Sequence, residues 1–362
     1  MIPAGWQETY KKHERWVPVA FFVLGFAFDA VMLKRIDEPM VLIQQALYIA
    51  LSATFIGLEL IEVTREVAPP RWLAKVWRFR EALLHFMLGT LLNCYTIFYF
   101  KSASAFTSFA FIAVLVGLLM VNEFKHFGKS QSRVHIAFLS LCLVSYLVAL
   151  VPILLGSLGL LAFLASIAAT VLVFGAYYRF MRGKLAAEPS LLRTHLLMPF
   201  GGILGIFCLL YFARVIPPVP LSVSYMGIFH EVKKSEGEYE LAYDRPAWKF
   251  WQHGDQTFRA RPGDSIYCFA RIFSPSRFND HLHVRWFYYD ERLGWEPSDA
   301  IPIAIQGGRE EGYRTVTMKK NYQPGEWRVQ IETQDNREIG RIGFTVEPDA
   351  NTGERVYSTI RQ

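Results

Sequence analysis

The sequence predicts two structural classes in one chain: an N-terminal α-helical transmembrane bundle and, after it, an all-β, immunoglobulin-like sandwich. Hydrophobic residues make up 52% of the 362 residues, which is above the usual range for a soluble protein. The long apolar runs stop at Ile216-Pro217-Pro218, and no later stretch is apolar enough to cross a bilayer. Beyond that point, short alternating runs are separated by Pro and Gly turns, as in strands. We therefore expect a polytopic transmembrane domain over residues 1–216 and a β-sandwich domain over residues 217–362.

The first domain contains about seven apolar runs, each close to the roughly 20 residues that a membrane-spanning helix needs. The predicted spans are Val17–Leu33, Met40–Ile61, Ala82–Phe100, Ala103–Val121, Val134–Leu155, Leu158–Phe180 and Leu196–Ile216. The first run carries Asp29 and lacks a small-residue cleavage site, so we expect it to remain as a span and not to be a signal peptide.

The Lys and Arg residues between the spans predict the orientation. With a cytoplasmic N-terminus, about fifteen of them lie in cytoplasmic segments and about four lie on the opposite side. This bias, combined with an odd number of spans, exports the C-terminal domain. We therefore expect a bacterial inner-membrane protein in contact with the lipid bilayer, with a cytoplasmic N-terminus and a periplasmic C-terminal domain.

The charge and cysteine content argue against several other classes. The net charge of +6 comes from the membrane half, which has about 19 Lys and Arg against about 11 Asp and Glu, whereas the second half is near neutral. Short basic loops explain this excess, so we expect no nucleic-acid partner. Three of the four cysteines fall in apolar spans and Cys268 stands alone in the second half, so no disulfide, metal or cofactor motif is predicted.

Ionisable residues inside spans are costly and are therefore functional candidates. The candidates are Asp29, Glu59, Glu62, Glu81 and His85. The two glutamates at 59 and 62 share one helix face, as do Glu81 and His85. Such a group could relay protons or hold a cation. The alternative is that these residues are paired with loop arginines in headgroup water, which their positions near the span ends favour.

Residues 71–80, RWLAKVWRFR, place Trp, Leu, Val and Phe among Arg and Lys. This composition is typical of an interfacial amphipathic helix, with its basic groups facing the headgroups and its rings in the acyl boundary. We expect a lipid-contact anchor here, and a partner-docking helix is the alternative.

The second domain shows no helix-period pattern. The predicted strands are Leu221–Val232, Tyr239–Ala242, Ala247–Trp251, Gln256–Ala260, Ser265–Phe273, His281–Tyr289, Ile301–Ile305, Tyr313–Met318, Trp327–Glu332 and Ile339–Val346. Turns such as Arg261-Pro262-Gly263-Asp264 and Gln323-Pro324-Gly325 separate them, and their spacing is that of an all-β sandwich.

The end of the chain resembles a known family. A Gly325-Glu326-Trp327-Arg328-Val329 strand is followed by a hairpin and by a Gly343-Phe344-Thr345-Val346 strand. These motifs resemble the bacterial domain of unknown function 2914, and the layout is similar to proteins that carry this domain behind a helical membrane region. The resemblance covers the last third of the chain. It implies a non-enzymatic sandwich and carries over no catalytic residues.

Three surface features of the second domain could bind a ligand. Trp248 and Trp251, and farther on Trp295, give an aromatic density that suits stacking on sugar rings, although core packing is the alternative. Arg309 lies in a glycine-rich turn, where it could pair with Asp299. His281 and His283 share a strand face but lack a third ligand, so no metal site is predicted.

These observations lead us to expect a non-catalytic envelope protein whose exported sandwich binds a partner protein or an envelope glycan. The alternative is proton- or ion-coupled transport through the bundle, which would depend on the intramembrane acids. Internal repeats and paired broken spans, which build the midplane sites of many transporters, are missing from the sequence. A lipid-linked glycan enzyme fits least, because the exported loops are short and poor in carboxylates.

Overall fold

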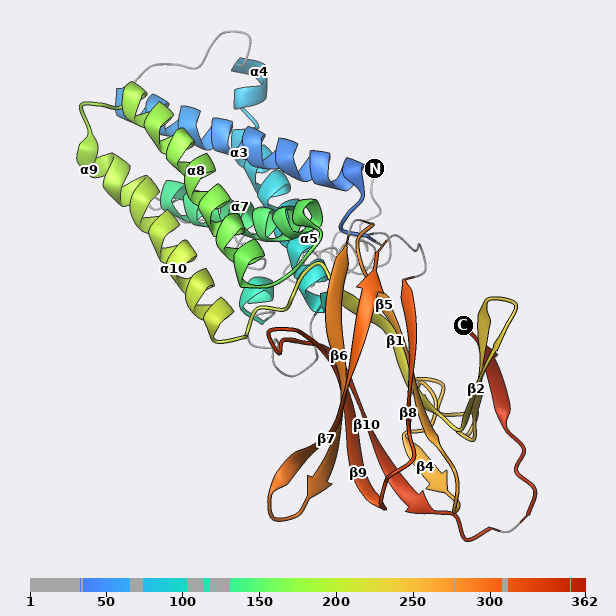
Figure 1. Cartoon of the computed structure of the whole chain (residues 1–362). Helices are drawn as coiled ribbons and strands as arrows, with labels where there is room; N and C mark the ends of the chain where they lie inside the picture. Colours follow the sequence, from blue (N-terminus) through green and yellow to red (C-terminus); the bar gives the residue numbers. More distant parts are fainter. Residues whose placement is uncertain are drawn as a thin grey trace, which may run out of the picture.

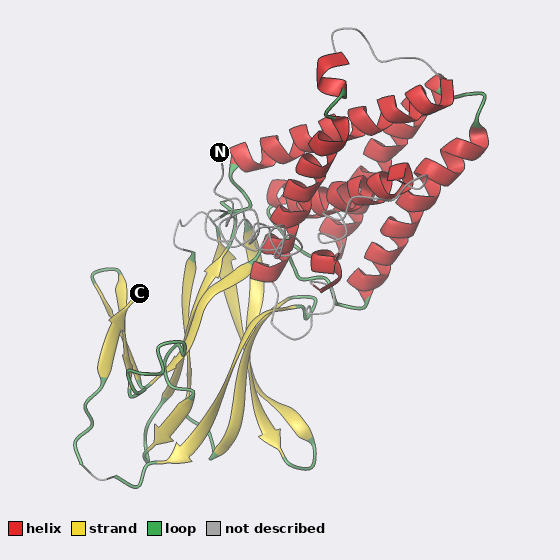
Figure 2. Ribbon diagram, turned by 180° about the vertical axis from the view of Figure 1, so that it is seen from behind, coloured by secondary structure: helices red, strands yellow, loops and turns green. Residues whose placement is uncertain are grey.

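The structure is a computed structural model that describes residues 33, 35–65, 74–102, 113–117, 131–276, 278–307, 312–351 and 353–362. Within these residues, the chain is helical up to Phe212 and forms strands from Ser222 onward. Figure 1 shows the helices gathered at one end of the molecule and the strands at the other, and Figure 2 shows the same division from behind. The predicted order of a helical region followed by a β domain is confirmed.

Among the residues just named, five helices are long and apolar enough to span a membrane. They are α3 (Pro39–Arg65), α5 (Arg80–Ser102), α7 (Gln131–Leu155), α8 (Leu160–Lys184) and a continuous helix made of α9 (Pro189–Leu192), the π-turn Arg193–Leu197 and α10 (Met198–Phe212). A short helix, α4 (Ala74–Trp77), precedes α5. The predicted spans 17–33 and 103–121 lie outside the described residues, apart from Leu33 and residues 113–117, so the count of seven is not confirmed.

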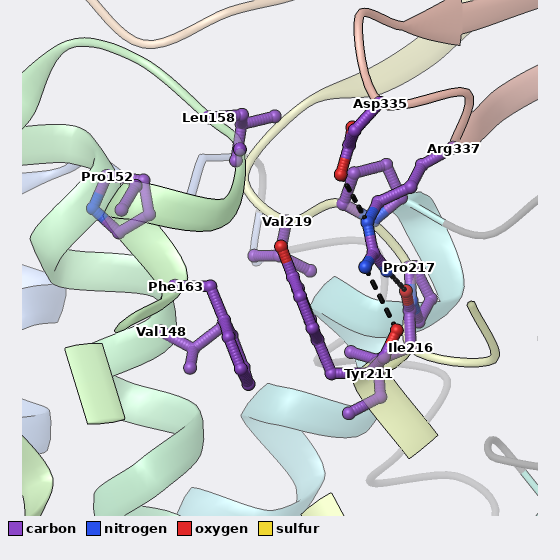
Figure 3. A pocket seen from close by; sticks show the side chains of 13 residues that line it. Val148, Pro152, Leu158, Phe163, Tyr211, Ile216, Pro217, Val219, Asp335 and Arg337 are labelled. Carbon is purple, nitrogen blue, oxygen red and sulfur yellow. Dashed lines mark hydrogen bonds and ion pairs between the residues drawn. The ribbon is translucent and has the colours of Figure 1, made fainter. Parts of the chain in front are cut away.

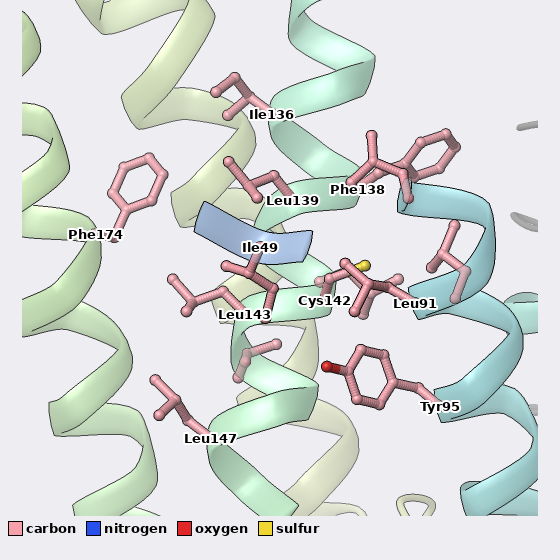
Figure 4. Close-up of a cluster of buried hydrophobic side chains, with 14 of the residues drawn as sticks. Ile49, Leu91, Tyr95, Ile136, Phe138, Leu139, Cys142, Leu143, Leu147 and Phe174 are labelled. Carbon is pink, nitrogen blue, oxygen red and sulfur yellow. The ribbon is translucent and has the colours of Figure 1, made fainter. Parts of the chain in front are cut away.

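Helix α7 is the centre of the bundle and packs against α3, α5, α8 and α10. About 67% of its most apolar window is buried, against 28% for α8 and 22% for the α9–α10 helix, so the latter two expose apolar faces as lipid-facing helices do. Figure 4 shows the core, where Leu139 and Leu143 of α7 lie between Ile49 of α3, Leu91 of α5 and Phe174 of α8. This packing stabilises the bundle through close van der Waals contact.

The β domain consists of three sheets. The first contains β1 (Ser222–Phe229), β5 (Ile266–Phe273) and β8 (Tyr313–Lys319) in the order β1-β5-β8. The second contains β4 (Thr257–Ala260), β10 (Glu338–Pro348), β9 (Gly325–Thr333), β6 (Asn279–Asp290) and β7 (Gly294–Gln306) in that spatial order. The third is a small sheet of β11 (Ser358–Arg361), β3 (Glu238–Tyr243) and β2 (Glu231–Ser235). It projects from the side of the domain, clear of the helices (Figure 1).

Strand alternation explains how these sheets pack. Along β5, Ile266, Cys268 and Ala270 face the large sheet, while Phe269 on the opposite face belongs to a separate cluster with the small sheet. Trp286 of β6 is fully buried in the main core, where its ring meets that of Phe344 edge to face at 6.1 Å. The central strand β5 is therefore covered on both faces.

Two strand predictions are wrong. The run Leu221–Val232 is not one strand, because β1 ends at Phe229 and β2 begins at Glu231. The run Ala247–Trp251 is not a strand but a pair of turns. The guanidinium of Arg245 donates to the main-chain carbonyls of Lys249 and Gln252, and the backbone curls around it. Strand β11 was not predicted, since its four residues carry little strand signal.

Candidate functional site

An exposed aromatic cluster stands on the connection between β3 and β4, which we call the aromatic loop (residues 245–253). The side chains of Trp248, Phe250 and Trp251 are 65%, 79% and 58% exposed. Trp248 and Trp251 meet at 5.6 Å and 65°, and Phe250 and Trp251 meet at 5.3 Å and 82°. The ammonium of Lys249 lies 5.3 Å from the Trp248 ring. The predicted candidates Trp248 and Trp251 therefore lie together at the surface, and Phe250 joins them.

The base of the aromatic loop is fixed to the end of β1. Gly254 forms a parallel bridge with Ile228, and the amide of Asp255 donates to Ile228 O at 2.7 Å. The carboxylate of Asp255 in turn accepts the amide of Asp244 at 3.0 and 3.1 Å. Together with the bonds from Arg245, these contacts hold the loop in one shape although its rings are in solvent.

A buried histidine–aspartate pair lies beneath this base. His230 Nε2 and Asp255 Oδ2 are 3.7 Å apart, and both side chains are almost completely buried. The His230 ring stacks on Phe258 at 4.0 Å and on Tyr357 at 4.9 Å. Burial lowers the pKa of His230 to about 4, and Arg355 contributes to this shift. Burial also raises the pKa of Asp255 to about 7. Desolvation is the largest cause of both shifts, so both groups are mostly neutral between these two values.

The opposite shifts predict opposite pH slopes for two variants. Between about pH 4.5 and 6.5, the folded state holds the Asp255 proton that the unfolded state releases, so this group makes stability fall as pH rises. For His230 the unfolded state binds the extra proton, so stability rises with pH. The two terms nearly cancel in the native protein. As the pH rises by one unit in this range, the His230→Phe variant should therefore lose about 1 kcal/mol of stability, and the Asp255→Asn variant should gain about 1 kcal/mol.

Tryptophan-monitored thermal unfolding of the full chain in detergent at several pH values measures these slopes. If the stability of the two variants changed with pH in the same direction, it would contradict the conclusion that His230 and Asp255 are both neutral in the folded protein.

The other predicted surface candidates do not join the aromatic loop. Trp295 on β7 is partly buried, with the Arg328 guanidinium 4.3 Å from its ring and Tyr289 at 5.2 Å. Arg309 lies outside the described residues. Its suggested partner Asp299 forms an ion pair with Lys319.

The intramembrane acids fall into different environments. Glu59 of α3 has its Oε2 atom 3.9 Å from His135 Nδ1 of α7, and the His135 ring meets His85 of α5 edge to face at 6.0 Å. Glu62 instead accepts the indole N–H of Trp77 at 2.9 Å. Trp77 is therefore buried against α3, stacked on Phe55, which corrects the expectation that its ring lies in lipid.

Two of the acidic candidates take no part in the Glu59–His135 contact. Glu81 is exposed, and Asp29 lies outside the described residues. Among the residues that the structure describes, no group of three or more His, Cys, Asp or Glu side chains is arranged to hold a metal ion.

The helices and the β domain meet at a junction centred on Arg337 of the β9–β10 hairpin (Figure 3). Its guanidinium donates to Tyr211 O at 2.9 Å and to Ile216 O at 3.5 Å, and it pairs with Asp335 at 2.7 Å. It also lies 3.7 Å from the centroid of the Tyr211 ring, which stacks on Phe163 at 3.4 Å. The cation thus neutralises the carbonyl end of α10. The adjoining cavity of about 30 Å³ has room for a water molecule but not for an organic ligand.

Two further segments of the helical region are attached to the β domain. Between α7 and α8, the Leu158 amide donates to Asp280 Oδ2 at 3.0 Å, and Gly156 O accepts the Asn279 amide at 2.9 Å. Before α3, Asp37 Oδ2 accepts the Ser276 amide at 3.4 Å, and the Arg35 guanidinium lies 5.6 Å from the centroid of the Phe273 ring. Three separate segments of the helical region therefore hold the β domain.

Sequence reasoning missed three residues of these sites. His135 had a usable signal, since it is an ionisable residue at the start of a predicted span. Phe250 also had a signal, as a third ring beside the two predicted tryptophans. Arg337 had none, because an arginine in a predicted hairpin is usually in solvent.

Comparison with known proteins bears on the β domain. Residues 279–346, from the start of β6 into β10, match the family model described as "Protein of unknown function (DUF2914)". No match to a curated protein was found.

Among solved structures, an immunoglobulin-like protein from Pseudomonas aeruginosa is similar, at 12% identity over 36% of this chain and 98% of that chain, with a TM-score of 0.22. A β-glucosidase from Listeria innocua is 13% identical over 25% of this chain and 15% of that chain, with a TM-score of 0.19. A β-glucosidase from Bifidobacterium adolescentis is 7% identical over 38% of this chain and 18% of its own, also with a TM-score of 0.19. The chain thus spans less than a fifth of these two β-glucosidases, and no functional argument follows from these likenesses. The resemblance predicted from the closing strands is confirmed: this multi-pass chain carries the DUF2914 match in its C-terminal β domain.

Proposed function

We propose that this protein is a non-catalytic component of a bacterial inner membrane, whose exported, immunoglobulin-like β domain binds an envelope partner through the aromatic loop. The observation that carries the proposal is the loop itself. Three large rings are held in solvent by a network of main-chain bonds, although burying such rings would be favourable. Exposed aromatic clusters on a fixed backbone are typical of binding surfaces.

The distribution of basic residues supports export of the β domain. The helix ends on the side of the β domain carry Arg35, Lys101 and Arg214. The opposite ends and their connections carry a larger set within the described residues: Arg65, Lys75, Arg78, Arg80, Arg133, Arg179, Arg182, Lys184 and Arg193. The larger set belongs on the cytoplasmic side by the positive-inside rule, which leaves the β domain in the periplasm.

The shape of the cluster favours a protein partner over an envelope glycan. The rings of Trp248, Phe250 and Trp251 stand at steep angles to one another, so they form a projecting knob and not a flat platform. A sugar stacks best on a flat or concave surface, whereas an apolar knob fits a groove in another protein. Lys249 adds a positive charge, which an acidic rim of that groove would complement.

We expect Trp251→Ala to weaken partner binding at least about tenfold without changing stability, because truncating an interface anchor costs about 2 kcal/mol while this exposed ring stabilises the fold little. The measurement is photo-crosslinking in cells that express the full chain with p-benzoylphenylalanine in place of Phe250. Discrete protein adducts that disappear with Trp251→Ala are expected. Leu293→Ala, at another exposed apolar position, is the matched control and should leave the adducts intact.

A second probe separates the two ligand classes. Soluble peptidoglycan fragments added to the full chain in detergent should leave its tryptophan fluorescence unchanged if the partner is a protein. Quenching that depends on Trp251, with no protein adducts, would favour the glycan. Neither adducts nor quenching would contradict a binding role for the aromatic loop.

A further inference from the structure

His135 is buried and Glu59 is mostly shielded from solvent, and neither side chain completes its hydrogen bonds within the described residues. The Glu59 side chain is 16% exposed and that of His135 is 4% exposed. Glu59 Oε2 and His135 Nδ1 face each other at 3.9 Å, which is too long for a hydrogen bond. Among the described residues, neither of these two atoms has a hydrogen-bond partner. An acid and a base poised in this way can exchange one proton through a single bridging water.

A column of buried polar groups continues from this pair through the bundle. On α3, Gln45, Ser52 and Glu59 recur every seven residues, so they lie on one face and extend over roughly 20 Å of the roughly 30 Å apolar layer. On α5, the Tyr95 hydroxyl points toward α7 (Figure 4). Within the described part of the chain, Gln45 Oε1, Ser52 Oγ and the Tyr95 hydroxyl have no hydrogen-bond partner, although all three side chains are buried.

Gln45 makes one interhelical contact, since its Nε2 atom donates to Cys94 Sγ of α5 at 3.4 Å. Its Oε1 atom, Ser52 Oγ and the Tyr95 hydroxyl are not satisfied by such contacts within the described residues. An unsatisfied buried polar atom costs about 1–3 kcal/mol, and a set of them along one seam is stable only if water completes their bonds. We propose that Glu59 and His135 form a protonation site at one end of a hydrated column between α3, α5 and α7, through which protons cross the apolar layer. This activity goes beyond partner binding by the β domain and does not depend on it.

The proton balance of the step is simple. The O–H bond of protonated Glu59 breaks as an N–H bond forms at His135 Nδ1, which leaves a carboxylate and an imidazolium. The carboxylate takes its next proton from the aqueous face at the nearby helix ends, and the imidazolium gives its proton to the column. An imposed pH gradient sets the direction.

Several other titratable or charged groups lie on the elements packed around this pair. Those toward the same helix ends include Glu62 and Arg65 on α3, Arg80, Glu81 and His85 on α5, Arg133 on α7, Tyr177, Tyr178, Arg179, Arg182 and Lys184 on α8, and His195 in the π-turn. Glu62 is bonded to Trp77, the Tyr177 hydroxyl donates to Ala53 O at 3.0 Å, and His195 Nδ1 lies 2.7 Å from Ser132 Oγ. Glu81 and the two arginines of α8 are exposed. Among the described residues, the His85 ring meets the His135 ring edge to face.

Proteoliposomes that contain the full chain and an internal pH dye test the proposal. The wild type should collapse an imposed pH gradient several-fold faster than protein-free liposomes. Glu59→Gln and His135→Asn should return the rate to the protein-free level, while Glu59→Asp, which keeps a carboxyl group, should retain part of it. Glu62→Gln is the matched control, since its carboxylate lies one turn away and already has a partner, and it should leave the rate unchanged.

Three results would overturn the proposal. These are a wild-type rate equal to that of protein-free liposomes, a Glu59→Gln rate equal to the wild-type rate, or an equal loss in Glu59→Gln and Glu62→Gln. Thermal unfolding of each reconstituted variant excludes loss of the fold, and if Glu59→Gln fails to fold, the contrast between Glu59→Asp and His135→Asn decides.

Discussion

Replacing Arg337 by alanine is expected to release the β domain from the helical bundle. The side chain is only 10% exposed. It supplies hydrogen bonds to the carbonyls of Tyr211 in α10 and of Ile216 in the segment after α10, and a cation–π contact with Tyr211. A hydrogen bond from a charged group contributes about 1.5–3 kcal/mol and a desolvated cation–π contact about 1–2 kcal/mol. The variant should therefore lose about 3 kcal/mol of the free energy that holds the two parts together, because such terms do not add fully.

Limited proteolysis of the full chain in detergent measures this release. The segment between Phe212 and Ser222 is mostly buried in the native protein, and it should become cleavable in Arg337→Ala. Arg341→Ala is the matched control, since Arg341 lies four residues later, on β10, and pairs with Glu338 within its own strand. Arg337→Lys should be cleaved at an intermediate rate, because a lysine keeps the charge but not the planar stacking. Equal cleavage of the Arg337→Ala and Arg341→Ala variants would contradict the role of the junction.

Replacing Gly254 by alanine is expected to displace the aromatic loop. A Cβ atom built on Gly254 would lie 2.0 Å from Ile228 O, and the residue has a φ of +71°. The positive φ costs about 1–2 kcal/mol for a residue with a side chain, and the clash with main-chain atoms adds about 1–3 kcal/mol. The bridge between Gly254 and Ile228 should break, because neither backbone can yield without losing strand or loop contacts.

Gly237→Ala provides the control for this change. Gly237 also has a positive φ, of +89°, but nothing lies within 4 Å of its added Cβ atom. It should therefore lose about 1 kcal/mol, against about 2–5 kcal/mol for Gly254→Ala. Thermal unfolding of the full chain compares the two, and the crosslinking yield at position 250 should fall only in Gly254→Ala. A full yield in that variant would show that the loop holds its shape without the bridge.

The sequence predicted those features that depend on local pattern. The five long apolar helices of the described residues follow from the length of the apolar runs, and strands such as β6 and β9 follow from alternation and from the turns that bound them. The strand prediction for Ala247–Trp251 was wrong because aromatic residues have strand propensity, whereas the conformation of this run is determined by the hydrogen bonds from Arg245. Propensity alone cannot detect such a contact.

The candidate site was predicted less completely, because its residues are distant in sequence. Glu59 was identified as an acid inside a span, but its partner His135 lies 76 residues later, and only the packing of α7 against α3 brings them together. The role of Arg337 likewise depends on α10 ending beside the β9–β10 hairpin, 126 residues away from Tyr211. Without this tertiary arrangement, the residue resembles any arginine in a turn.

The aromatic loop lies far from the three attachments that hold the rim of the β domain, so a rotation of the domain moves the loop more than it moves the rim. Strand β1 leaves the junction at Ser222, and the aromatic loop is attached at Ile228, roughly 20 Å farther along the strand. Because the domain is attached to three separate segments of the helical region, a tilt of α10 alone is opposed by the other two attachments, and the domain turns as a rigid body only when the three segments move together. The rings of Trp248, Phe250 and Trp251 lie on this distant loop, so they then sweep a longer arc than the attachments at the rim.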